Sequence, residues 1–288
     1  MSSLVGVFTR FLYVVFGIIL LSAFVGLFAN GIQLNFTAFI NNIIQIVKSL
    51  IFPKELVILG PTQHEYSIFL NFWEYYFYSL TIFISAFCMS IIMGLLITYL
   101  TILLPQKVKG LISRVVSFLE SLPDLFIIMV IQFSVIYYFT KTGTLLFPVA
   151  GSSHNNTYFL PIIALALIPS FMIFRINLYL ANEEWNKPYV ELARSKGINK
   201  THIYFSHVLR NMAPSIFSHS KSIVLYLLSS MLIFEKLFNI SGIFTYIISY
   251  PNPSIIAFTL IMFFLPIFIL YALITIIIEK NTGQRLEW

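Results

Sequence analysis

Several charged residues fall within or beside strongly apolar segments of this sequence, where a charge can do chemistry. Glu120 and Asp124 lie one helical turn apart, Arg175 lies in a later segment, and Glu235 stands beside Lys236 in another. A lone charge in hydrocarbon is costly, so such residues pair with each other or serve a substrate or a gate. We expect Arg175 to form a structural or gating pair with Glu120 or Asp124, and substrate contact is the alternative. Glu235 could meet a substrate, whereas Lys236 snorkels to the interface.

A charged island, ANEEWNKPYVELARSKGINKTHIYFSHVLRNMA, occupies residues 181–213. Pro188 suits a first helical turn, where its missing N–H costs nothing. Gly197 can take the left-handed conformation that ends a helix, and Asn199 can cap the next one. We therefore predict a helix, a tight glycine corner and a second helix.

One face of this predicted hairpin carries small residues, and charges surround it. Val190, Ala193 and Gly197 recur at spacings of three and four, so they share a face that a partner backbone can approach closely. Glu191, Arg194 and Lys196 can set the orientation of that partner through contacts at the rim. The alternative is a solvated amphipathic hairpin that lies on lipid headgroups, and the residues alone leave both possibilities open.

No catalytic, cofactor-binding or metal-binding set is expected in the sequence. A GxxxxGK[ST] phosphate loop is absent, so ATP binding in the usual way is not expected of this chain, and no nucleophile stands with a base. The single cysteine, Cys88, excludes an intrachain disulfide. The five histidines lack the spacing of a metal site to a carboxylate or thiol, and we expect them to be structural: His64, His154, His202, His207 and His219.

The composition is that of a membrane protein. Apolar residues make up 59% of the chain and charged residues 10%, and the mean hydropathy is +0.90, whereas about a quarter of residues are charged in soluble domains. The apolar runs are continuous, which favours helices over a barrel that alternates in and out. The net charge of +6 is carried in short loops beside these runs, where basic residues set topology, so we expect no nucleic-acid partner.

Six membrane spans are predicted, at approximately 11–29, 76–104, 115–139, 158–180, 216–240 and 255–279. Placing both termini in the cytoplasm puts twelve basic residues inside and only Lys48, Lys54 and Lys141 outside, as the positive-inside rule requires. The first run is longer than the apolar core of a cleaved signal peptide, about 7 to 15 residues, so we expect it to be retained. The fold class is therefore an all-α, multi-pass membrane protein.

The predicted organisation divides the chain after residue 74. Residues 1–74 hold the first span and a long external segment, and residues 75–288 hold the five-span core with its island. Within the external segment, FINNIIQIVKSLIF has apolar residues at helical spacing but also Asn41, Asn42, Gln45 and Lys48. A crossing would bury too many polar groups, so an interfacial helix is expected there.

The island resembles the cytoplasmic EAA loop of permease subunits of bacterial ABC importers, in the branch that imports oligopeptides, dipeptides and nickel. The stretch YVELARSKG, and a histidine ten residues after its glycine, match that pattern in register. Glu191 departs from the residue usual in this branch but suits the wider EAA pattern. The resemblance implies a coupling helix that contacts an ATPase through Tyr189, Glu191, Ala193, Arg194, Lys196, Gly197 and His207.

Shorter matches occur in the family's order along residues 75–285. They are the serine and leucine at Ser79 and Leu80, SLPDLF at 121–126, FPVAG at 147–151, Arg175, the trio Glu235, Phe238 and Gly242, and Tyr250 with Pro251. Ser241 and Phe244 depart from the family's proline and glycine, and the first external loop lacks its usual PGDP. These departures leave the expected fold intact and leave the substrate open.

The resemblance implies a type I importer permease in a bacterial plasma membrane, where it forms half of a translocation path. Its partners would be a second permease subunit, expected to be a different chain, two cytoplasmic ATPase subunits that hold ATP and Mg²⁺, an external substrate-binding protein and membrane lipid. The cargo would be a peptide or a related small solute, with nickel or a metal chelate as a further option.

Two other functions remain open from the sequence. An ion-gradient-driven secondary transporter or channel would need coupling carboxylates near the bilayer centre and inverted repeats with broken helices. The carboxylates here are sparse, and no repeat is visible. The other is a membrane scaffold or sensor that transports nothing. Uptake driven by ATP, compared with uptake driven by an ion gradient alone, separates these functions.

Overall fold

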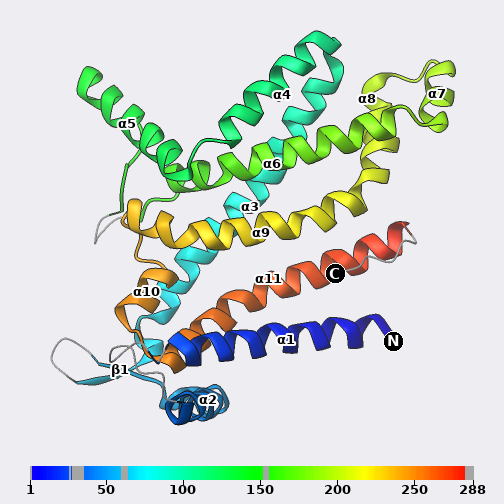
Figure 1. Ribbon diagram of the computed structural model, residues 1–288. Coiled ribbons are helices and arrows are strands. Elements are labelled where there is room, and N and C mark those ends of the chain that lie inside the picture. The colour runs from blue at the N-terminus through cyan, green and yellow to red at the C-terminus, as the bar shows by residue number, and fades with distance from the viewer. Residues whose placement is uncertain (1, 26, 28–35, 60–63, 152–155, 283–288) are drawn as a thin grey trace. The chain divides into compact units, whose positions relative to one another are not determined.

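A computed structural model of the chain describes residues 2–25, 27, 36–59, 64–151 and 156–282 (Figure 1). Six helical segments in this part are long and apolar enough to cross a membrane, which confirms the all-α membrane fold. They are Phe8–Val25, Phe72–Leu103, Asp124–Thr142, Phe159–Trp185, Lys200–Leu237 and Pro253–Lys280.

The helices that contain these spans are α1 (Ser2–Val25), α3 (Phe72–Leu103), α5 (Asp124–Thr142), α6 (Phe159–Trp185), α9 (Leu209–Leu237) and α11 (Pro253–Thr282). Shorter elements lie between them: α2 (Phe36–Ile51), β1 (Val57–Leu59), β2 (Glu65–Ser67), α4 (Gln106–Glu120), α7 (Pro188–Ser195), α8 (Lys200–Ile203) and α10 (Ile243–Ser249). Three single turns complete the described elements: Pro53–Glu55, Ile68–Leu70 and the π turn Tyr204–Val208.

The third span begins later than the sequence predicted. A span over 115–139 was expected, but the helix is broken after Glu120 and begins again at Asp124. Pro123 provides the physical reason, because it has no N–H to continue α4 and disfavours helical geometry in the residue before it. Glu120 therefore ends one helix and Asp124 begins another, so the two carboxylates do not share a helical face as expected.

The chain forms two compact units that are not continuous in sequence. The first contains residues 1–80 and 241–276, and the second contains residues 81–240 and 277–288. The organisation expected from the sequence divided the chain once, after residue 74.

In the first unit, α1 and α11 lie side by side (Figure 1). The Phe11 ring lies 5.0 Å from the Phe268 ring. The predicted interfacial segment is the helix α2, which packs on α1 with Ile46 and Ala23 fully buried. The Asn42 amide donates to the Ala23 carbonyl at 3.3 Å, so part of its polar surface is satisfied within the chain. The opposite face of α2 exposes an apolar stripe: Phe36, Ile40, Ile44, Val47 and Ile51.

A short hairpin of β1 and β2 follows α2 in the external segment, with Val57 opposite Ser67 and Leu59 opposite Glu65. These strands were not expected from the sequence. They have three residues each, which is too short to show a clear alternation of apolar and polar side chains.

In the second unit, α6 is the most buried of the six spans and lies side by side with α9 (Figure 1). It also approaches α3 closely, at Gly94. A Cβ on Gly94 would lie 2.5 Å from Cγ2 of Ile173 and 3.0 Å from the Ser170 carbonyl oxygen. Glycine at this point lets the two backbones approach, as small residues do between membrane helices.

Gly94→Ala is therefore expected to destabilise the protein by about 1 to 3 kcal/mol through overpacking. The measurement is the melting temperature of the purified protein in detergent. Gly17→Ala is the matched control, because nothing lies within 4 Å of a Cβ on this helical glycine. An equal effect of both substitutions would contradict the close packing of α3 and α6.

Candidate functional site

The structure contains the predicted helical hairpin between α6 and α9. It consists of a helix, a glycine corner and a second helix. Helix α7 has Pro188 in its first turn and ends at Ser195. Gly197 follows with a φ of +75°, in the left-handed region that glycine adopts without steric cost. The side chain of Asn199 then caps α8 by accepting a hydrogen bond from the Thr201 N–H at 3.3 Å.

The small face of α7 points into the chain's own core. Val190 is fully buried and Ala193 is 6% exposed, in a cluster that also contains Ala181, Ile203 and Tyr204. This corrects the expectation that Val190 and Ala193 form the surface for a partner. The physical reason is that burying these apolar groups against the helices that flank α7 stabilises the loop itself.

The exposed side of α7 is different and consists of Glu191, Leu192, Arg194, Ser195 and Lys196, followed by Gly197. We call these six residues the α7 rim. Leu192 is 57% exposed and is the only large apolar side chain among them. Sequence reasoning missed it, although a single leucine among charges on a short helix is a usable signal, because interface centres favour large side chains within a polar border.

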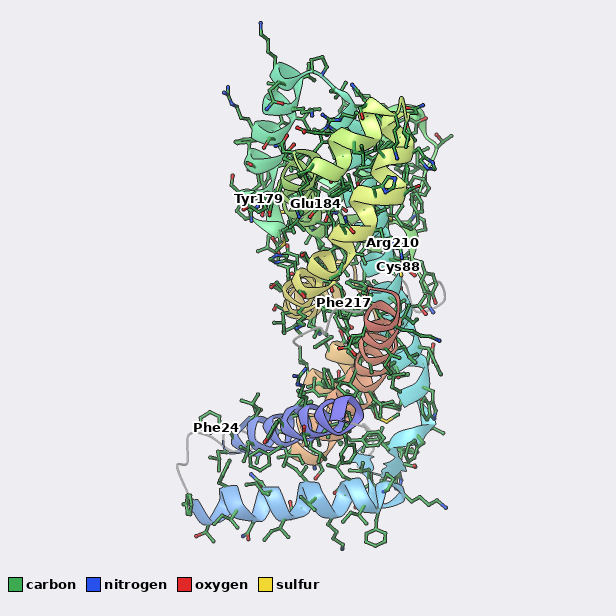
Figure 2. All side chains as sticks on the ribbon, turned by 90° about the vertical axis from the view of Figure 1, so that its right-hand side faces the viewer. Phe24, Cys88, Tyr179, Glu184, Arg210 and Phe217 are labelled. Carbon is green, nitrogen blue, oxygen red and sulfur yellow. The ribbon has the colours of Figure 1, made fainter. Side chains whose placement is uncertain are left out.

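Helix α7 is fastened to the end of α6 by side-chain contacts. Glu184 of α6 forms an ion pair with Lys187 and accepts a hydrogen bond from the Tyr189 hydroxyl. Burial, and after it the hydrogen bond to Glu184, raise the pKa of Tyr189 to about 12. The Arg194 guanidinium lies 4.9 Å from the Trp185 ring centre and donates to the Trp185 carbonyl at 3.2 Å. Glu184 is labelled on α6 in Figure 2.

On its other side, α7 is connected to α9 through α8 and the π turn. The ring of Tyr204, in the π turn, packs 5.4 Å from that of Tyr99 of α3, and the Tyr99 hydroxyl lies 3.0 Å from the Thr201 hydroxyl. His207 is half-buried behind α7, with its ring 6.5 Å from that of Tyr189. Tyr189 and His207 thus support α7 from behind, and the rim supplies its exposed surface.

A further basic group lies close to the α7 rim. Partial burial lowers the pKa of Lys109 on α4, and the nearby positive charges of Lys200 and Arg194 lower it further. The three cations belong to α4, α7 and α8. Together with Lys196 they surround the corner with positive charge.

The structure places the charged residues of the apolar segments in separate surroundings. Arg175 Nη2 lies 3.1 Å from Glu120 Oε1, so the arginine pairs with one of the two carboxylates that the sequence offered. The side chain of Glu120 is 15% exposed, whereas that of Arg175 is 61% exposed. Asp124 instead accepts a hydrogen bond from Ser230 of α9. Glu235 is 1% exposed, which argues against substrate contact at its carboxylate because the surface does not reach it.

Three residues of the shorter sequence motifs, Gly151, Phe238 and Ser79, form hydrogen bonds that hold loops. The Gly151 N–H donates to the Phe238 carbonyl at 2.8 Å, and the Asn239 amide donates to the Gly151 carbonyl at 2.9 Å. In the first unit, the Ser79 hydroxyl accepts a hydrogen bond from the Ile243 N–H at 2.7 Å. These motif residues therefore fix loops.

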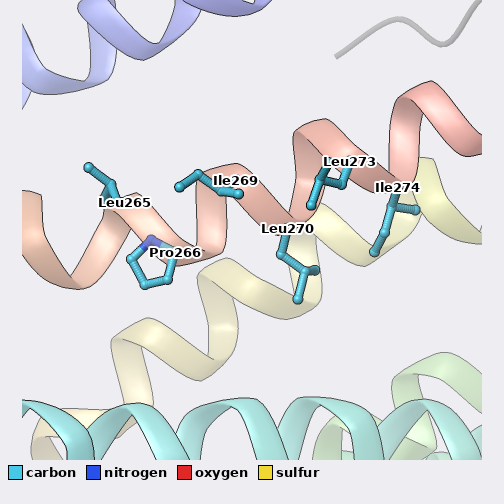
Figure 3. A pocket seen from close by; sticks show the side chains of 6 residues that line it. All are labelled: Leu265, Pro266, Ile269, Leu270, Leu273 and Ile274. Atoms are coloured by element: carbon cyan, nitrogen blue, oxygen red, sulfur yellow. The ribbon is translucent and has the colours of Figure 1, made fainter.

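A hollow of about 430 Å³ lies beside α11 in the first unit (Figure 3). Its lining is entirely aliphatic: Leu265, Pro266, Ile269, Leu270, Leu273 and Ile274. Such a surface suits lipid or a neighbouring helix and offers no group that could orient a polar ligand. The polar groups that could act on a ligand lie instead in the second unit, on α4, α5, α6 and α9.

Comparison with known proteins covers this second unit almost completely. Residues 90–279, about two thirds of the chain, match the family described as binding-protein-dependent transport system inner membrane component. Over 146 residues the chain is 27% identical to the dipeptide transport system permease protein DppB of Lactococcus lactis subsp. cremoris (strain MG1363). That similarity covers 49% of this chain and 48% of DppB, so the chain spans about half the length of this relative.

Proposed function

The chain belongs to the family of binding-protein-dependent transport system inner membrane components, and from this premise we propose that it is one transmembrane half of an ATP-driven importer. Its α7 rim is the surface that a cytoplasmic ATPase subunit contacts. The single observation that carries the proposal is the construction of α7, which exposes a charged rim and is fixed from behind to two membrane-spanning helices.

The mechanism follows from these attachments. A push on the rim acts on a helix whose inner face is buried in the chain's own core, so α7 does not move alone. The contacts of Glu184 and Trp185 transmit the displacement to α6, and α8 with the π turn transmits it to α9. Tightly packed interfaces switch between discrete arrangements, so ATPase closure changes how these spans face the path. ATP and Mg²⁺ are held by the ATPase subunits.

The surface of α9 supports a second permease subunit and a path between the two. Between Met212 and Glu235, four polar residues of this spanning helix are exposed: Ser218, His219, Ser222 and Ser229. The exposed part of Arg175 belongs to another span. Polar groups inside a membrane face a protein partner or water rather than lipid. We therefore assign this side of the second unit to the translocation path, shared with a second and different permease chain.

The proposed cargo is a short peptide, because the curated relative is a dipeptide permease; nickel or a metal chelate is the alternative cargo. An external substrate-binding protein would deliver the cargo. We propose that both termini and α7 lie in the cytoplasm of a bacterial cell, because this orientation puts most of the basic residues inside.

The test is reconstitution of the full complex, with both permease subunits, two ATPase subunits and the binding protein, in proteoliposomes. We expect accumulation of radiolabelled dialanine that requires ATP hydrolysis and persists when proton and sodium gradients are abolished. Uptake that follows an imposed ion gradient without ATP would instead establish the secondary transporter.

A further inference from the structure

The carboxylate of Asp124 lies between α5 and α9, where two hydroxyl groups hold it. The Ser230 hydroxyl donates to Asp124 Oδ2 at 3.2 Å, and the Tyr226 hydroxyl also hydrogen-bonds to this carboxylate. Both partners belong to α9, one turn apart. The side chain of Asp124 is therefore oriented by neutral groups and remains partly exposed.

This carboxylate lies between two spanning helices. Asp124 is the first residue of the span Asp124–Thr142. Its partners lie within α9, which rises by about 1.5 Å per residue, so Ser230 lies about 10 Å and Tyr226 about 16 Å from the end of α9 at Leu237. Asp124 is thus held at the start of one span and against the interior of another.

No cation neutralises Asp124 within the described residues, since none of their basic side chains lies within 4.0 Å of it. Glu120, three residues before Pro123, has Arg175. Hydroxyl groups fix the direction of a carboxylate but do not cancel its charge, and an uncompensated charge between spanning helices is costly. The site is therefore complete only when a positive group joins it.

The surroundings of Asp124 indicate that a positive group can reach it from the exposed polar face of α9. On α9 the residues that hold the carboxylate, Tyr226 and Ser230, lie on the same arc of the helix as the exposed Ser222 and Ser229. The carboxylate therefore borders the polar surface of α9 that we assign to the translocation path.

We propose that Asp124, oriented by Ser230 and Tyr226, binds the ammonium group of a peptide cargo during its passage. This inference rests on the proposed function and deepens it. A free peptide carries an ammonium group at its amino terminus, which gives three donors to a carboxylate and neutralises its charge. A proton or a cation of the second permease subunit would also neutralise Asp124, and the experiment separates these cases from the cargo.

The test compares two probes in the full reconstituted complex: dialanine, which has the ammonium group, and N-acetyl-dialanine, which lacks it. Asp124→Asn keeps the size and hydrogen bonds of the side chain but removes its charge. We expect it to lower ATP-driven dialanine uptake about tenfold or more, whereas Asp124→Glu retains most of it. Uptake of N-acetyl-dialanine should not change. Ser134→Ala is the matched control, because this exposed α5 hydroxyl donates to the Val130 carbonyl of its own helix.

The binding protein selects cargo before the membrane step, so the same comparison is made in the purified complex without it. Dialanine should raise the melting temperature of the wild-type complex but not that of Asp124→Asn, and N-acetyl-dialanine should raise neither. Equal losses of uptake for both probes, or equal stabilisation of wild type and variant by dialanine, would overturn the inference. A wild-type complex that imports neither probe with ATP would overturn the proposed function itself, and the inference with it.

Discussion

Gly197→Glu is expected to lower ATP-driven uptake about a hundredfold, because it places a charged side chain in the centre of a docking surface. Gly197 is exposed, and nothing lies within 4 Å of a Cβ built on it, so the new side chain would point outward from the corner after α7. The chain should still insert and assemble. ATP hydrolysis by the partner subunits should continue without driving uptake.

The φ of +75° at Gly197 adds a second effect, since any other residue there strains the backbone by about 1 to 2 kcal/mol. Gly143→Glu is the matched control. Gly143 has a φ of +70°, is exposed and has nothing within 4 Å of its Cβ, but it follows α5 and not α7. We expect the strain in both variants and the loss of coupling only in Gly197→Glu. Equal losses of uptake would show that strain alone explains the effect.

Arg175→Gln is expected to destabilise the assembled complex by about 3 kcal/mol or more, because it leaves the carboxylate of Glu120 without its cation. Glu120 is largely buried, and its Oε2 atom has no hydrogen-bond partner among the described residues. The reverse substitution, Glu120→Gln, should cost less than about 1 kcal/mol, since the exposed guanidinium of Arg175 stays hydrated in the path. The melting temperature of the complex and its uptake rate measure both effects.

The double variant Glu120→Gln with Arg175→Gln completes the comparison. It removes both charges, so it should be more stable than Arg175→Gln alone. Equal destabilisation by the two single substitutions would contradict the unequal burial of the pair, and an additive double variant would contradict the pair itself.

Local signals in the sequence were sufficient for the helices and for the corner after α7. Long apolar runs predicted six spans, and Pro188, Gly197 and Asn199 predicted the corner because each acts through its own backbone or cap. The direction of α7 was not predictable in the same way. Whether Val190 and Ala193 meet a partner or the chain's own core depends on how α7 packs, in a cluster that also includes the distant residues Ile102 of α3 and Val116 of α4.

For the polar residues of the apolar segments too, the sequence predicted which residues matter but not which residues they contact. The sequence identified Glu120, Asp124 and Arg175 as candidates because charges are rare in apolar segments. It could not choose between the two carboxylates, since that choice depends on the break at Pro123, which aims them at different helices. The contact between Asp124 and Ser230 joins residues 106 positions apart, and no periodic pattern reports such a contact.

The contact between the α7 rim and an ATPase subunit can be measured by site-specific crosslinking in native membranes. The exposed Cys88 is first replaced by serine; a cysteine is then introduced at the exposed Leu192 or at the buried Val190 of the same helix. We predict that a short thiol crosslinker joins the Leu192 position to the ATPase subunit and that the Val190 position gives no such product. In a complex that still imports cargo, the absence of an ATPase product from Leu192, or its labelling by an impermeant reagent added outside the cell, would contradict this assignment.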